Sequence, residues 1–203
     1  MAGKVYIVIY TSYYHIYKLA LEVQKGLEES GVEVKLFQVP ETLPQEVQTK
    51  MYMPAKPDIP IITAEQLVEP DGLIFGFPTR FGTMPAQFKA FLDSTGGLWS
   101  KGALTGKFGG LFTSTASQHG GQETTIMTAI TYFAHHGIIY VPLGYTNPAL
   151  FDITTVNGGS PYGAGVIAGG DGSRQPSESE LSVGKTQGLN FGNIVKTFVA
   201  GKQ

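Results

Sequence analysis

Short apolar runs alternate with helical patterns along this chain, and this alternation constrains the fold more than any other feature. Strand-like runs fall at residues 5–9, 32–39, 73–77, 108–113 and 138–142. Between or after these runs, residues 16–27, 85–95, 122–136 and 177–200 show patterns typical of helices. Gly31 ends the first of these helices. The pattern predicts a single α/β domain over residues 1–203, with a doubly wound five-stranded parallel sheet and helices on both faces.

Two segments break the alternation. Residues 40–62 hold five prolines, which predicts an irregular excursion after the second strand. Residues 144–176 are rich in glycine and predict long loops. Capping boxes at residues 63–66 and 177–180 predict the starts of a short helix and of the last helix.

The composition narrows the classes of function. With 42% hydrophobic and 15% charged residues, the chain resembles an ordinary soluble globular protein. A net charge of −2 lacks the positive field that nucleic acid binding needs, so we expect no nucleic acid partner. The absence of cysteine excludes disulfides and thiolate sites. With neither a signal pattern nor a bilayer-length apolar run, we expect a cytoplasmic protein without integral membrane association.

The sequence also predicts where a ligand would bind. In open parallel sheets, ligands lie outside the carboxyl ends of the strands, where the strand order reverses. The loops after the first, third and fourth strands are therefore the candidate site. They read TSYYHI at residues 11–16, PTRFGT at 78–83 and STASQHGG at 114–121.

The first of these loops suits a phosphate group. Thr11, Ser12 and Tyr13 supply hydroxyl groups, and the free N–H groups at the start of the following helix attract an anion. An N-capping turn without a ligand would use the same residue types. This loop alone therefore leaves both interpretations open.

The other two loops suit a flat ligand. Arg80 and Phe81 place a guanidinium beside an aromatic ring, which matches an electron-poor ring that carries carbonyl oxygens. A surface arginine and a partly buried phenylalanine that bind no ligand are commoner than such a ligand site. The small residues at 114–121 would let a planar ligand approach the backbone closely.

Trp99 and two adjacent histidines are further candidates. Trp99 follows two glycines in an expected loop, where a packing anchor is commoner than a ligand contact. His135 and His136 end a helix, and capping is the commoner role because adjacent residues do not share a helix face. Hydrolase and metalloenzyme motifs are absent, so we expect no metal site.

Taken together, these motifs resemble those of flavodoxin-like NAD(P)H:quinone oxidoreductases of the tryptophan-repressor-binding-protein (WrbA) type. The similar segments cover nearly the whole chain and read VPETLP, FGFPTRFG, FLDSTGGLW, GGQETT, AHHGI, VPLGY, GGSPYGAG and GGDGSRQP. The resemblance implies a flavodoxin-like fold, FMN as cofactor, NAD(P)H as co-substrate, quinones as acceptors and a homotetramer.

The resemblance also implies roles for individual residues. Arg80 and His135 become candidate catalytic residues that stabilise charge or hydrogen-bond beside the flavin. Tyr13 would contact the nicotinamide nucleotide, and Trp99 would form an aromatic wall over the ring. The residues implied to bind FMN are Thr11, Ser12, Tyr13, Tyr14, His15, Ile16, Thr79, Arg80, Phe81, Ser114, Thr115, Ala116, Ser117, Gln118, His119, Gly120 and His135.

Three residues depart from the family pattern. The family's phosphate loop reads Ser-x-Tyr-Gly-His, whereas this chain has Thr11 and Tyr14 at the first and fourth positions, and His119 replaces a usual glycine. Thr11 keeps a hydroxyl group. Tyr14 would strain the loop at a positive φ, but we expect a negative φ because Tyr14 opens a helix. We therefore predict an FMN site that persists, with affinity that these changes could weaken.

These observations predict an FMN-dependent NAD(P)H:quinone oxidoreductase that reduces quinones by two electrons to hydroquinones. One alternative is a family member with weakened or lost FMN binding that acts as a regulatory or stress-response binding protein, which Tyr14 and His119 favour. A second alternative is a one-electron flavodoxin carrier. The modest net charge and the long loops after the second and fifth strands disfavour it.

Overall fold

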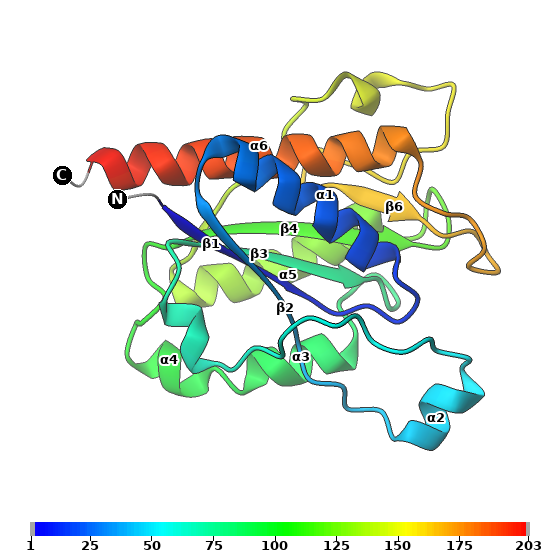
Figure 1. Cartoon of the computed structure of the whole chain (residues 1–203), viewed down its shortest axis with the longest axis horizontal. Coiled ribbons are helices and arrows are strands. Elements are labelled where there is room, and N and C mark those ends of the chain that lie inside the picture. Colours follow the sequence, from blue (N-terminus) through cyan, green and yellow to red (C-terminus); the bar gives the residue numbers. More distant parts are fainter. Residues whose placement is uncertain (1–2, 202–203) are drawn as a thin grey trace.

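Six parallel strands form one sheet in the computed structural model, which describes residues 3–201 (Figure 1). The strands are β1 (Lys4–Ile9), β2 (Glu33–Gln38), β3 (Gly72–Pro78), β4 (Phe108–Thr115), β5 (Ile139–Tyr140) and β6 (Gly165–Ile167). Their order is β2-β1-β3-β4-β5, and β6 pairs with the end of β4. This order confirms the predicted doubly wound, flavodoxin-like parallel sheet.

Helices cover both faces of the sheet, as predicted. They are α1 (His15–Ser30), α2 (Gln45–Lys50), α3 (Ala86–Asp93), α4 (Gly96–Ser100), α5 (Gln122–His136) and α6 (Glu178–Gly201). In Figure 1, α1 and α6 lie above the sheet, whereas α3 and α4 lie below it. Within residues 3–201, none of the helices combines the length and hydrophobicity that crossing a bilayer requires.

The interior strand β1 contributes side chains to both layers of the core. Val5, Ile7 and Ile9 belong to the cluster beneath α1 and α6, whereas Tyr6 and Val8 belong to the cluster beneath α3 and α5. Successive side chains of a strand point to opposite faces, so a strand covered on both faces must be apolar throughout. This requirement explains the continuous apolar run at residues 5–9.

The excursion at residues 40–62 contains a short helix that the sequence did not indicate. This helix, α2, has no buried residue. Figure 1 shows α2 in cyan at the lower right, projecting away from the sheet. After the excursion, the first predicted capping box forms in part, because the Thr63 N–H donates to the Gln66 side chain at 2.8 Å before a short 3-10 helix, η1 (Glu65–Val68).

Three other boundaries differ from the sequence predictions. The segment around Trp99 was expected to be a loop, but it forms the short helix α4. The long loop predicted at residues 144–176 includes a second 3-10 helix, η2 (Pro148–Phe151), and the strand β6. The fifth strand is shorter than predicted, because only Ile139 and Tyr140 pair with β4. Pairing with β4, which local propensity does not encode, decides the extents of β5 and β6.

The second capping box confirms the predicted start of the last helix. The Ser177 N–H donates to the Glu180 carboxylate at 2.8 Å, and the Glu180 N–H donates to the Ser177 hydroxyl oxygen at 3.2 Å. Each side chain thus satisfies a backbone group that the helix itself leaves free.

Helices α1 and α6 pack with their backbones in close contact. A Cβ atom added at Gly188 would lie 2.0 Å from the Val23 carbonyl oxygen, and one added at Gly26 would lie 2.0 Å from the Lys185 carbonyl oxygen. These contacts involve backbone, which cannot move aside as a flexible side chain can. Glycine at both positions therefore sets the distance between the two helices.

We predict that Gly188→Ala lowers the free energy of unfolding by about 1–3 kcal/mol, because the added methyl group forces α1 and α6 apart. Urea denaturation followed by circular dichroism measures this change. Gly97→Ala is the matched control, since a Cβ atom there meets nothing within 4 Å. Equal stability of the two variants would contradict the proposed helix contact.

Candidate functional site

A cavity of about 400 Å³ lies at the carboxyl ends of β1, β3 and β4. Small-molecule sites commonly have volumes of roughly 300–1,000 Å³. The three predicted loops meet at this cavity, as the reversal of strand order requires. The predicted site residues that line it are Thr11, Ser12, Tyr13, His15, Ile16, Thr79, Arg80, Ser114, Thr115 and Ala116.

The loop after β1 places hydroxyl groups at the start of α1. Thr11 and Ser12 line the cavity and are only 4% and 6% exposed. From the loop after β3, the Arg80 guanidinium donates to the Ser12 hydroxyl oxygen at 3.4 Å. Hydroxyl groups, a helix N-terminus and a guanidinium are each donors that favour a phosphate group.

Tyr14 has a left-handed backbone conformation, with φ 69° and ψ −8°. The predicted negative φ is therefore wrong. Tyr14 lies one residue before α1 begins, where the chain turns from β1 into the helix, and it does not share the helical dihedral angles that start at His15. The left-handed region costs a non-glycine residue about 1–2 kcal/mol, so this loop is strained where the family pattern has glycine.

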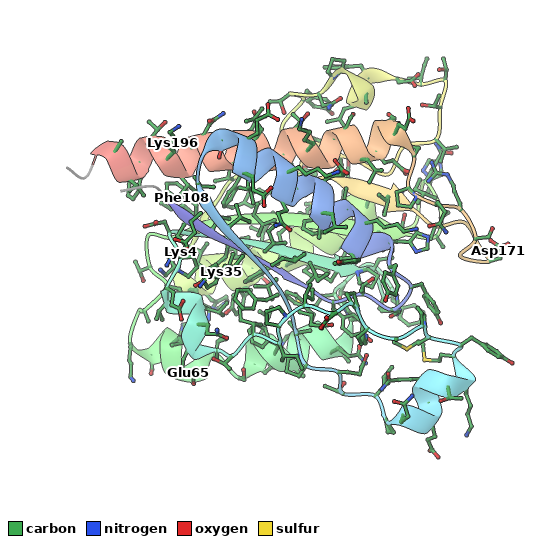
Figure 2. All side chains as sticks on the ribbon, in the orientation of Figure 1. Lys4, Lys35, Glu65, Phe108, Asp171 and Lys196 are labelled. Atoms are coloured by element: carbon green, nitrogen blue, oxygen red, sulfur yellow. The ribbon has the colours of Figure 1, made fainter. Side chains whose placement is uncertain are left out.

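The loop after β6 forms a further wall of the cavity, which the sequence analysis did not include in the site. Figure 2 shows Asp171 on this loop, at the opposite end of the molecule from Lys4 and Lys196. The available signal was GGDGSRQP, a glycine-rich segment that directly follows a short apolar run. The lining residues of this wall, which the predictions missed, are Ala168, Gly169, Gly170, Asp171 and Gly172, and Pro78 from the predicted loop at residues 78–83 also lines the cavity.

A buried carboxylate fixes the position of this wall. Glu180 is fully buried and accepts hydrogen bonds from the Ile167 N–H at 2.9 Å and from the Arg174 guanidinium at 2.8 Å. The Arg174 carbonyl oxygen accepts a hydrogen bond from His15 Nε2 at 2.8 Å. A buried charge is costly unless it is paired, and Glu180 meets this requirement through its hydrogen bonds. Together with the bond from His15, these contacts join α6, the loop after β6 and the loop after β1 into one network.

A tight turn follows β3 and directs Phe81 away from the cavity. Arg80 and Thr83 exchange backbone hydrogen bonds at 2.8 and 3.1 Å, and the residues between them, Phe81 and Gly82, have φ values of 54° and 80°. Two consecutive positive φ angles are typical of a type I′ turn. Phe81 is fully exposed and is not among the residues that line the cavity, so its contact with a flavin stays a prediction.

The loop after β4 contributes to two cavities. Residues 114–116 line the first, and Ser117 and Gly120 close a turn through an N–H to carbonyl bond of 3.2 Å. Gln118 and His119 line a separate cavity of about 380 Å³. The loop turns away from β1 after Ala116, so the residues implied to bind FMN do not all meet at one place.

His135 and Trp99 line a different cavity of about 500 Å³, between α3, α4 and α5. None of its lining residues belongs to the cavity at the ends of β1, β3 and β4. Trp99 is 58% exposed, so it is not the packing anchor that its position in the sequence suggested. His135 and Trp99 therefore line a cavity other than that of Arg80, and Thr83, which pairs with Arg80, borders their cavity.

His136 forms part of the same second cavity and has few polar neighbours. Its Nε2 shares a hydrogen bond with the Thr95 hydroxyl group at 3.2 Å, and its buried Nδ1 has no hydrogen-bond partner. Burial, and then the charge of His135, lower the pKa of His136. Among residues 3–201 no group of three or more histidine or carboxylate side chains is arranged to hold a metal ion.

Comparison with known proteins agrees with the family resemblance in the sequence. The family model for NADPH-dependent FMN reductases matches residues 14–148. The quinone-oxidoreductase QR2 of Triphysaria versicolor is 60% identical over 198 residues, which cover 97% of each chain. The NAD(P)H quinone oxidoreductase PST1 of Candida albicans is 53% identical over 189 residues, which cover 93% of this chain and 96% of that protein.

A solved structure supports the fold independently. The flavodoxin-like WrbA-like protein from Agrobacterium tumefaciens superimposes with a TM-score of 0.67 at 20% identity, over 97% of this chain and 99% of that one. At this level of identity, the likeness concerns the arrangement of strands and helices.

We predict that the stability of the protein falls between pH 7.5 and 5.5 more steeply than the stability of the variant His136→Gln. The folded-state pKa of His136 lies below its unfolded value near 6.5, so the unfolded chain binds the proton first as the pH falls. The folded state is therefore favoured above that value and loses stability as the pH falls through and below it. Urea unfolding at both pH values measures the free energy of unfolding of each protein. Equal losses of stability in the wild type and the variant would show that His136 does not cause the pH dependence.

Proposed function

Because the chain belongs to the family of NADPH-dependent FMN reductases, we propose that it is an FMN-dependent NAD(P)H:quinone oxidoreductase that reduces quinones by two electrons to hydroquinones. The names of the relatives QR2 and PST1 support this proposal. The observation that carries it is the cavity of about 400 Å³, which has a phosphate-type donor set at one side and small residues from other loops around it.

The lining residues fit FMN in two ways. The loop at residues 11–16 would hold the phosphate through Thr11, Ser12 and the first N–H groups of α1. Ala116 and Gly169–Gly170 have little or no side chain, so their backbone would lie against the flat ring. Arg80 reaches Ser12 and would contact both parts of the ligand.

FMN, when bound, supplies hydride transfer between a nicotinamide and a quinone, and the protein supplies binding, orientation and charge. Arg80 would place a positive charge beside negative charge that develops on the ligands. The buried Thr11 and Ser12 would exclude water from the phosphate end. A nicotinamide and a quinone would occupy the same open side of the cavity in turn.

The strain at Tyr14 favours one alternative, a family member with weakened or lost FMN binding that acts as a regulatory or stress-response binding protein. A strained loop holds its ligand-binding shape less firmly than the glycine-containing loop of the family pattern. The first experiment below separates the two functions because it measures flavin binding directly.

We predict that the protein binds FMN more tightly than riboflavin, because the loop at residues 11–16 acts through the phosphate. Ser12→Ala should weaken FMN by about tenfold or more, since it removes a hydrogen bond to a charged group, and should leave riboflavin unchanged. Quenching of flavin fluorescence gives both dissociation constants.

The FMN-loaded protein should then oxidise NAD(P)H with benzoquinone and give parallel initial-rate lines, because both substrates need the same side of the cavity. Equal affinity for FMN and riboflavin would refute the phosphate site. FMN binding without any turnover would favour the regulatory alternative.

We also propose that the protein is a homotetramer in which a neighbouring subunit completes the flavin site. Two separate observations support this. His135 and Trp99 line a cavity that shares no residue with the cavity of Arg80, and Trp99 is largely exposed. A second subunit could bring His135 and Trp99 to the open side of the first cavity.

Mixed oligomers test this assembly. We predict that Arg80→Ala and His135→Ala are each much less active, and that co-expressing them restores part of the activity, because some sites then receive Arg80 from one subunit and His135 from another. Sites confined to one chain could not regain both residues. An active monomer in light scattering, or no recovery in the mixture, would exclude the shared site.

A further inference from the structure

Side chains of the loop after β1 hold the excursion at residues 40–62 in place. The Tyr13 hydroxyl donates to the Met51 carbonyl oxygen at 2.8 Å, and the Tyr14 hydroxyl donates to the Ala55 carbonyl oxygen at 2.7 Å. The nearby helix α2 has no buried residue, so apolar packing does not fix it. Hydrogen bonds to the loop after β1 therefore provide much of the stabilisation of this part of the excursion.

Lys56 makes a third attachment, in which the side chain belongs to the excursion and the backbone group belongs to the loop after β1. Its ammonium donates to the Thr11 carbonyl oxygen at 2.9 Å, lies 2.7 Å from the Glu41 carboxylate and sits 4.3 Å from the centre of the Tyr10 ring. Hydrogen bonds from Lys56 and from the Leu43 N–H lower the pKa of Glu41, although burial alone would raise it. The carboxylate thus stays charged and keeps Lys56 on the loop.

The position of Tyr14 explains why these attachments matter. Glycine adopts a φ of 69° without strain, but a tyrosine in this conformation needs a compensating contact. The only hydrogen bond of the Tyr14 side chain within residues 3–201 is the one to Ala55. The Tyr14 ring also packs edge-on against Tyr17, with the ring centroids 5.7 Å apart, so the hydroxyl bond is the contact that ties Tyr14 to the excursion.

We propose that Tyr14 and Lys56 are positioning residues, which use residues 51–56 as a brace that holds the loop at residues 11–16 in the shape required to bind a phosphate group. The brace takes over the role that glycine has at position 14 in the family pattern. This inference rests on the proposed binding of FMN, so its test also needs a measurement without flavin.

Three substitutions at two positions separate the hydroxyl bond from the strain. Tyr14→Phe removes the bond and keeps the strain, so FMN should bind about threefold to tenfold more weakly. Tyr14→Gly removes both, so its dissociation constant should stay within about twofold of the wild type. Tyr145→Phe is the matched control, because Tyr145 is exposed and its hydroxyl group makes no hydrogen bond within residues 3–201. Riboflavin should bind all four proteins equally.

Trypsin reports on the brace without any flavin. Within residues 40–62 the sites for this protease are Lys50, which is exposed, and Lys56, which resists cleavage because Pro57 follows it. Cleavage after Lys50 should be several-fold faster in Tyr14→Phe, Tyr14→Gly and Lys56→Met than in the wild type, and unchanged in Tyr145→Phe. FMN should slow this cleavage in the wild type.

The outcomes are distinct. Unchanged cleavage in the flavin-free Tyr14→Phe and Lys56→Met proteins would overturn the brace, whether or not FMN binds. Equal loss of FMN affinity in Tyr14→Phe and Tyr14→Gly would overturn the link between the brace and the backbone strain. A wild-type protein that binds no FMN, but shows the expected cleavage pattern, would refute the proposed function and leave the brace itself supported.

Discussion

The pairing of β1 with β2 on one side and β3 on the other is the constraint on which the rest of this structure depends. Because the order reverses at β1, the chain leaves β1 and β3 towards opposite faces of the sheet, and the loops after these strands diverge. The space between them is the cavity that Ser12 and Arg80 line. The apolar character of β1 follows from the same arrangement, since helices cover both of its faces.

The loop after β1 is held from two sides. On one side, the buried Glu180 fixes Arg174, whose carbonyl oxygen accepts a hydrogen bond from His15. On the other side, Tyr14 and Lys56 bond to the excursion and to the loop backbone. The first support ends in the fully buried Glu180 carboxylate, whereas the second joins half-buried side chains to an excursion whose helix α2 has no buried residue. The second support should therefore open more readily, and changes in residues 40–62 should reach the cavity through it.

The site is also divided in space. His135 and Trp99 lie together on α5 and α4, but their cavity is separate from that of Arg80. An exposed tryptophan and an exposed Phe81 at a strained turn are features that association with another subunit would explain, because both side chains would then be covered. The proposed tetramer accounts for both the divided site and these exposed aromatic side chains.

The sequence by itself determined the order of strands and long helices, because apolar periodicity reflects which face of an element is buried. It also identified the three loops of the site, since parallel strands bring their carboxyl ends to one edge. Only the tertiary structure decided the φ of Tyr14, the direction of Phe81 and the wall at residues 168–172. These depend on contacts between segments far apart in the chain, such as Tyr14 with Ala55 and His15 with Arg174. Local propensity carries no information about such contacts, because their energies arise only when the segments meet.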